Sequence, residues 1–184
     1  MSPPPCACCS GELDVSDPRF DLELPQPVLE MDGEDYRRHV RFASDAVVIT
    51  DNIGGFARAL LPIGLVDGRT TTIGVWVSLD PEVFRHFMAV GSGKLPFDQM
   101  QFEGRLASEL DPWGSRLLRL PLLAGVDVPT YGKRRTPHIK SSPDPLLTEI
   151  LSRRWPAAEV LTGGMAWAVE YDRNTPGPPQ RHNH

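Results

Sequence analysis

Long hydrophobic runs are missing from this chain, and so is a set of cysteines from which a disulfide framework could be built. Crossing a bilayer takes about 20 consecutive apolar residues, and the 184 residues contain no such run. The first residues carry neither a basic region nor an apolar stretch, so we expect no signal peptide. The three cysteines, an odd number, lie within four positions, which does not suit a disulfide framework. We therefore expect a reduced, cytoplasmic protein that binds no membrane.

An excess of positive charge is also missing. The chain holds 19 Lys and Arg against 24 Asp and Glu, which gives a formal net charge of −5. This acidic balance argues against a general nucleic-acid binder. Hydrophobic residues make up 40% and charged residues 23%, as in a folded rather than a disordered chain. A chain of this length buries about 70% of its unfolded surface, so its core needs neither disulfides nor a metal.

Complete catalytic motifs are missing as well. There is no Gly-x-Ser-x-Gly elbow and no His-Glu-x-x-His pair. The segment Gly91–Lys94 resembles a phosphate-binding loop, but Met88 occupies a position that requires glycine, and Leu95 replaces the Ser or Thr after the lysine. We interpret Gly91 as the end of a helix, and we assign no catalytic residue.

Proline, in contrast, is abundant at 19 residues, about twice its average share, which predicts many short elements. The clearest strand is Thr70–Leu79, which alternates aliphatic residues on one face with Trp76 on the other. Asp80-Pro81 and Asp144-Pro145 each supply the cap and the first-turn proline of a helix. The segment Gln101–Leu110 fits a strand and a helix equally well.

The order of these patterns predicts an α+β fold, with a mainly antiparallel sheet and two or three short helices packed on it. No regular internal repeat is visible, so a repeat architecture is not expected. Residues 1–13 are predicted to form a Pro- and Cys-rich turn, residues 14–171 a single α+β domain, and residues 172–184 a disordered tail.

The amino-terminal cysteines are the candidate metal ligands. Cys6 and Cys9 form a C-x-x-C pair, and Cys8 is a candidate third ligand. A tight turn of this kind points two thiolates at one zinc ion, but a structural site needs four ligands. The fourth would come from His39, His86 or a carboxylate, because no second C-x-x-C pair is present. The alternative is a metal-free, solvent-exposed turn. Zinc is therefore the one candidate cofactor.

Five residues are candidates for binding another molecule. Lys133, Arg134 and Arg135, together with His138, form the one dense basic segment, which suits a phosphate or an acidic partner surface. A solvated hairpin turn is the alternative for this segment. Trp76 points away from the aliphatic face of its strand. Either both faces of the sheet are covered, or Trp76 lies in a groove for a partner or a ligand.

Several segments together resemble an uncharacterised bacterial family, domain of unknown function 2199. The most distinctive is Gly74–Leu79, with the sequence Gly-Val-Trp-Val-Ser-Leu. The cluster Cys6–Cys9 and the segment Ser44–Ile49 also resemble this family, as do the later stretches Gly104–Leu106 and Asp144–Leu146.

The resemblance extends over roughly residues 6–155. In the family, a stretch containing histidine tends to follow the cysteines. Here the residues at positions 10–13 are Ser-Gly-Glu-Leu, which departs from that pattern and weakens the zinc hypothesis. Because the family has no assigned activity, the resemblance implies a fold group and a bacterial origin but no reaction.

Three functions are consistent with these observations. The first is a non-catalytic cytosolic module, such as an accessory or immunity-type protein, whose sheet face or basic loop binds another protein. The second is a small structural zinc-binding protein. The third is an enzyme of unknown class that uses His39, His86 or His138 beside a carboxylate. We favour the first, because no catalytic set is complete and the net charge is acidic. The sequence specifies neither the partner nor the oligomeric state.

Overall fold

The computed structural model describes residues 19–96, 100–126 and 136–160. Within these residues the chain forms strands joined by short helices, and no helix is long and apolar enough to cross a membrane. The strands are β1 (Arg19–Asp21), β2 (Val40–Ala43), β3 (Val47–Thr50), β4 (Gly55–Gly64), β5 (Thr70–Leu79), β6 (Gln101–Leu106), β7 (Pro121–Gly125) and β8 (His138–Ser141). The helices are α1 (Gln26–Leu29), α2 (Gly33–His39), α3 (Pro81–Gly91), α4 (Pro145–Ser152) and α5 (Ala157–Val160), with a 3-10 turn at Ser115–Leu117.

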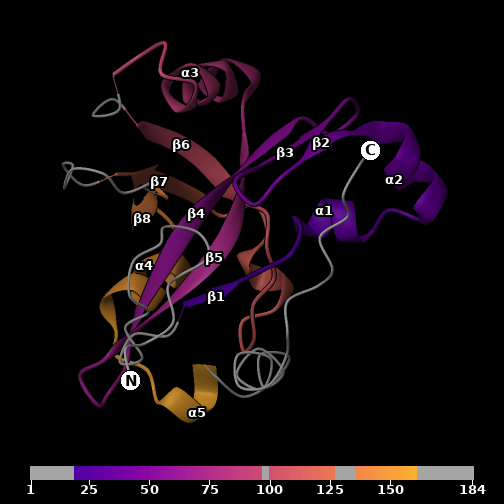
Figure 1. Cartoon of the computed structure of the whole chain (residues 1–184). Helices are drawn as coiled ribbons and strands as arrows, with labels where there is room; N and C mark the ends of the chain where they lie inside the picture. Colours follow the sequence, from indigo (N-terminus) through magenta and orange to yellow (C-terminus); the bar gives the residue numbers. More distant parts are fainter. Residues whose placement is uncertain (1–18, 97–99, 127–135, 161–184) are drawn as a thin grey trace, which may run out of the picture.

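Strands β4 to β8 close into a barrel. Each pairs antiparallel with the next along the chain, and β8 returns to lie beside β4. A meander with an odd number of strands leaves its first and last strands pointing the same way, so the β4–β8 pairing that closes the barrel is parallel. β3 and β2 continue the sheet from β4, while β1 adds to β5 in a second parallel pairing (Figure 1).

The predicted α+β fold, a mainly antiparallel sheet with two or three short helices packed on it, is therefore wrong. The structure is a closed mixed barrel with three further strands and only small helices. The closure depends on the pairing of Leu60 with His138, where the Leu60 N–H donates to the carbonyl oxygen of Pro137 at 2.7 Å. A contact between residues so distant in the sequence leaves no trace in local hydrophobic alternation.

The positions of several individual strands and helices are confirmed. The strand predicted at Thr70–Leu79 is β5 with the same bounds. Helices α3 and α4 begin at the predicted prolines, and α3 ends at Gly91. The Asp144 carboxylate accepts hydrogen bonds from two backbone N–H groups in the first turn of α4, whereas the Asp80 side chain makes no such bond at α3.

Two hydrophobic clusters cover the two faces of the central strands. The larger one fills the barrel and includes Ile73, Val75 and Val77 of β5. The smaller one lies on the outer face of β5 and joins Trp76 to buried side chains that include Val28 of α1. Of the two alternatives for Trp76, both faces of the sheet being covered is the one that the structure confirms.

The structure does not test the predicted domain bounds. The amino-terminal turn at 1–13 and the tail at 172–184 lie outside the described residues. The single domain at 14–171 stays a prediction.

Candidate functional site

An open groove lies where β5 ends before β6 does. The last aligned pair of these two strands places Ser78 opposite Arg105. After Leu79 the chain leaves the sheet, because Pro81 has a fixed φ that suits the first turn of a helix. Gly104 still lies against Ser78 and Leu79 of β5, whereas the residues of β6 before it lie beside α3 (Figure 1).

The backbone in this part of β6 points in a defined direction. Met100 and Leu106 make their backbone hydrogen bonds on the β7 side, while the Ala107 N–H donates to β5 at 2.8 Å. Because antiparallel strands alternate between bonded and non-bonded positions, the N–H and C=O groups of Gln101 and Glu103 point away from β7, toward the groove. Within the described part of the chain, neither residue pairs with β5.

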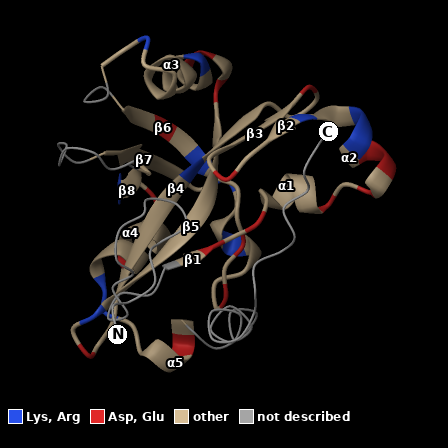
Figure 2. Cartoon of the chain, viewed as in Figure 1, with Lys and Arg blue, Asp and Glu red and all other residues tan. Residues whose placement is uncertain are grey.

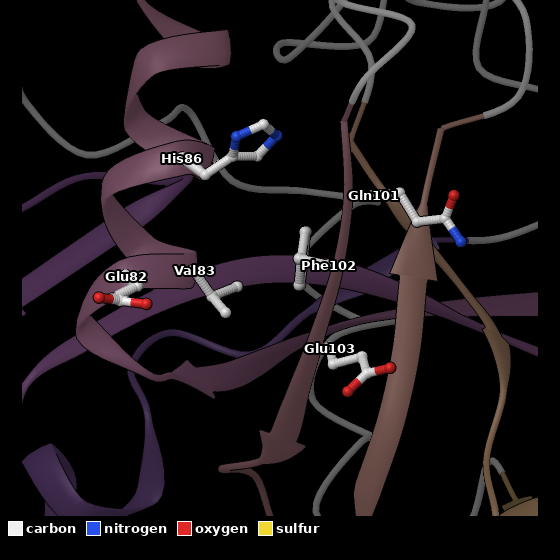
Figure 3. Close-up of a pocket in the computed structure, with 6 residues that line it drawn as sticks. All are labelled: Glu82, Val83, His86, Gln101, Phe102 and Glu103. Carbon is white, nitrogen blue, oxygen red and sulfur yellow. The ribbon is translucent and has the colours of Figure 1, made fainter.

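The floor of the groove is apolar. Val83 and His86 project from α3 toward β6 (Figure 3). Phe102 is buried at 4% exposure and packs edge-on against Phe87 of α3, with ring centroids 5.3 Å apart. The space between α3 and β6 amounts to about 360 Å³ and opens to solvent.

The rim of the groove is acidic. Glu82 and Glu103 contribute carboxylates from opposite sides, and none of the six described lining residues is Lys or Arg. The Glu82 carboxylate lies 3.6 Å from the Arg85 guanidinium, and both side chains are largely exposed. Figure 2 shows acidic residues on β6 and where the chain enters α3.

The lining combines apolar side chains with two carboxylates and one imidazole. An apolar floor with two carboxylates at its rim favours a ligand that carries both an apolar group and a cation. His86 is partly buried and lines the groove from α3.

Trp76, a predicted binding residue, does not line this groove. Its ring is fully buried and its indole N–H donates to the carbonyl oxygen of Leu22 at 3.1 Å. The Arg58 guanidinium lies 4.3 Å from the ring centroid. Trp76 therefore fastens the segment after β1 to the outer face of the barrel.

Sequence reasoning did not identify Arg58, the partner of this tryptophan. Arg58 is 6% exposed, although buried arginines are rare unless paired. Its guanidinium donates to the backbone of Asp45 and of Gly74 and lies 3.7 Å from the Asp21 carboxylate. These contacts join β1, β4 and β5, so this buried charge has a structural role.

His39 has a carboxylate partner at the surface. Its Nδ1 lies 2.7 Å from Asp51 Oδ1, and Arg41 donates to the other oxygen of the same carboxylate. The hydrogen bond with His39 is the main cause that lowers the pKa of Asp51, and Arg41 adds to it. The Asp51 N–H also donates to the carbonyl oxygen of His39 at 3.1 Å. These bonds join the end of α2 to the end of β3.

The remaining predicted residues are placed only in part. His138 is the first residue of β8, opposite Gly125 of β7, and is partly buried. Among the described residues, no group of three or more His, Cys, Asp or Glu could hold a metal ion. The other predicted binding and metal residues lie outside the described ranges: Lys133, Arg134, Arg135, Cys6, Cys8 and Cys9.

Of the groove residues, His86 was named from the sequence as a candidate metal ligand or catalytic residue, and the other five were not identified. Glu103 belongs to the segment that fits a strand and a helix equally, so no face could be assigned to its side chain. The signal that was available was the turn at Asp80-Pro81, which fixes where β5 ends. The turn at Asp80-Pro81 does not show that β6 extends beyond the end of β5.

Comparison with known proteins identifies a family. A family model described as an uncharacterized protein conserved in bacteria (DUF2199) matches residues 5–150. No match was found among curated proteins or among solved structures.

Proposed function

The chain belongs to this family of uncharacterised proteins conserved in bacteria, and on that premise we propose that it is a non-catalytic module that binds another protein through the groove between α3 and β6. The observation that carries the proposal is the composition of the groove, which has an apolar floor, two carboxylates and no cation among its described lining residues. Transient protein interfaces combine an apolar centre with a polar rim in this way.

The other two hypotheses have less support. The zinc hypothesis concerns cysteines outside the described residues, and it stays a prediction. The enzymatic hypothesis named His39, His86 or His138 beside a carboxylate, and it stays a prediction. The Asp51 carboxylate beside His39 is also engaged by Arg41 at the surface, while His86 lines the groove with Glu82 and Glu103. We expect binding to occur in the reducing cytoplasm, because three clustered cysteines make no disulfide framework.

A charge-reversal pull-down tests the proposed function. The full chain, its Glu103→Lys variant and its Glu159→Lys variant would each be used as bait in lysate of the bacterium that encodes it. Glu159 is exposed on α5, at the opposite end of the molecule from α3, so its replacement makes the same charge change away from the groove (Figure 1).

We expect one partner, recovered at near-stoichiometric level by the natural chain and by Glu159→Lys but lost from Glu103→Lys. Circular dichroism of the three baits would establish that all are folded. Recovery of no partner, or equal recovery by all three baits, would reject the groove as the binding surface.

A further inference from the structure

We propose that Arg105 and Arg119, at the turn that leads from β6 toward β7, bind a carboxylate on an acidic segment of a partner protein. The inference concerns a second surface, and it uses none of the residues that line the groove between α3 and β6. It combines two observations: an arginine held in a backbone conformation that favours glycine, and two neighbouring guanidinium groups that have no carboxylate partner in the described residues.

Residues 117–120 form a type II turn. The Leu120 N–H donates to the Leu117 carbonyl oxygen at 3.2 Å. Leu118 has a φ of −61° and a ψ of 134°, and Arg119 has a φ of 66°. The second central residue of such a turn is normally glycine, because its φ is positive. Among the described residues, Arg119 alone combines a positive φ with a side chain.

The same arginine lies in a β-bulge. The Leu106 N–H donates to the Leu120 carbonyl oxygen at 2.9 Å, and the Leu106 carbonyl oxygen accepts from the Arg119 N–H at 2.7 Å. Two residues therefore face one, and the first of the two, when it has a left-handed conformation, is typically glycine. Both motifs favour glycine at position 119, so a side chain there costs stability. Strained residues of this kind cluster at binding sites.

The surrounding structure holds this turn in place. Leu117 is fully buried, and Leu120 packs against the core of the barrel. The Arg105 guanidinium donates to the Arg119 carbonyl oxygen at 3.3 Å, which makes the two arginines neighbours. Both of their side chains are exposed. The turn therefore presents two adjacent cations to solvent from a backbone that packing and hydrogen bonds keep fixed.

The charges around the turn favour a carboxylate as the ligand. Neither Arg105 nor Arg119 forms an ion pair in the described part of the chain. The planar guanidinium fork matches the two oxygens of a carboxylate. A phosphate dianion or a nucleic acid is less suitable, because the chain has a net charge of −5 and Glu103 is exposed two residues before Arg105. We therefore expect Asp or Glu on a partner segment.

Nuclear magnetic resonance of the full chain measures binding at the arginine side chains themselves. The probe is the blocked peptide Ser-Gly-Asp-Glu-Gly-Ser, the uncharged control is Ser-Gly-Asn-Gln-Gly-Ser, and inorganic phosphate is the second anion, all at equal ionic strength. We expect the acidic peptide to shift the Nε–H signals of Arg105 and Arg119 with a Kd on the order of 1 mM. The exposed Arg37 on α2, away from this turn, should not respond (Figure 1).

Two substitutions separate binding from strain. Arg119→Gly removes one cation and should weaken the acidic peptide about fivefold. It should also raise the thermal unfolding midpoint by about 2–4 °C, because the relieved strain exceeds the extra freedom of glycine in the unfolded chain. The matched control Arg37→Gln also removes one exposed cation, and it should leave peptide binding unchanged.

Four outcomes would overturn the inference. A lower midpoint for Arg119→Gly would show that glycine is not favoured at this position. No shift at either arginine with roughly 10 mM acidic peptide, or an equal shift with the uncharged peptide, would reject the carboxylate site. An equal response at Arg37 would show nonspecific ion association. Tighter binding of inorganic phosphate than of the acidic peptide would identify a phosphate group as the ligand instead.

Discussion

Replacing Gly74 with alanine should disconnect the buried arginine from its carboxylate partner. Gly74 of β5 lies opposite Asp21 of β1. A Cβ atom at position 74 would come within 1.9 Å of Asp21 Oδ1 and 2.8 Å of its Cγ. These distances are far below any contact that the two atoms tolerate, so the Asp21 carboxylate must move away from Arg58.

The expected loss of stability has two parts. Forcing a methyl group into an occupied space costs about 1–3 kcal/mol. Breaking a buried ion pair costs about 3–5 kcal/mol when both partners are buried. Arg58 is 6% exposed but Asp21 is 41% exposed, so the second part falls well below that range. We expect Gly74→Ala to lower the free energy of unfolding by about 2–4 kcal/mol in total.

Urea unfolding of a double-mutant cycle measures this directly. In an Asp21→Ala background the obstructing carboxylate is absent, so Gly74→Ala should cost at least about 1 kcal/mol less than in the natural chain. Gly91→Ala is the matched control, because a Cβ there meets nothing within 4 Å. It lies at the end of α3 and should leave stability unchanged or raise it by up to about 1 kcal/mol. Additive costs at positions 74 and 21, or a loss below about 0.5 kcal/mol for Gly74→Ala, would refute the reasoning.

Three other predictions concern the surface pair, the buried ring and the cysteines. Because its hydrogen bond with His39 lowers the folded-state pKa of Asp51 below the ordinary 3.8, the resulting stabilisation is present above pH 3.8 and lost as the pH falls through the folded value. Acid titration of unfolding should show a steeper loss for the natural chain than for Asp51→Asn, and parallel curves would contradict this. Trp76→Phe removes the bond to the Leu22 carbonyl and weakens the guanidinium contact. It should cost about 1–2 kcal/mol in thermal unfolding, and an unchanged stability would count against it. The zinc alternative predicts about one equivalent of metal in untagged protein by atomic emission, and less than about a tenth would end it.

Local structure could be predicted where one residue type decides it. A proline after an aspartate fixed the start of α3 and of α4, and the alternation of aliphatic residues delimited β5. The closure of the barrel could not be predicted in this way, since the pairing of Leu60 with His138 joins distant parts of the chain. Alternation shows which face of a strand is buried but does not show which strand lies beside it.

The site was harder to predict than the fold for a related reason. Phe102 and Leu106 are spaced as on one face of a helix and also as on one face of a strand, so the pattern does not distinguish the two. Only the assembled sheet shows that Glu103 faces a groove. Trp76, in contrast, was identified from its strand pattern, but whether it is covered depends on α1 and on the segment after β1.

The most direct test of binding at the groove between α3 and β6 is the pull-down with the natural chain, Glu103→Lys and Glu159→Lys as baits. The account predicts that the natural chain and Glu159→Lys recover the same partner and that Glu103→Lys loses it. Equal recovery by all three baits would contradict it.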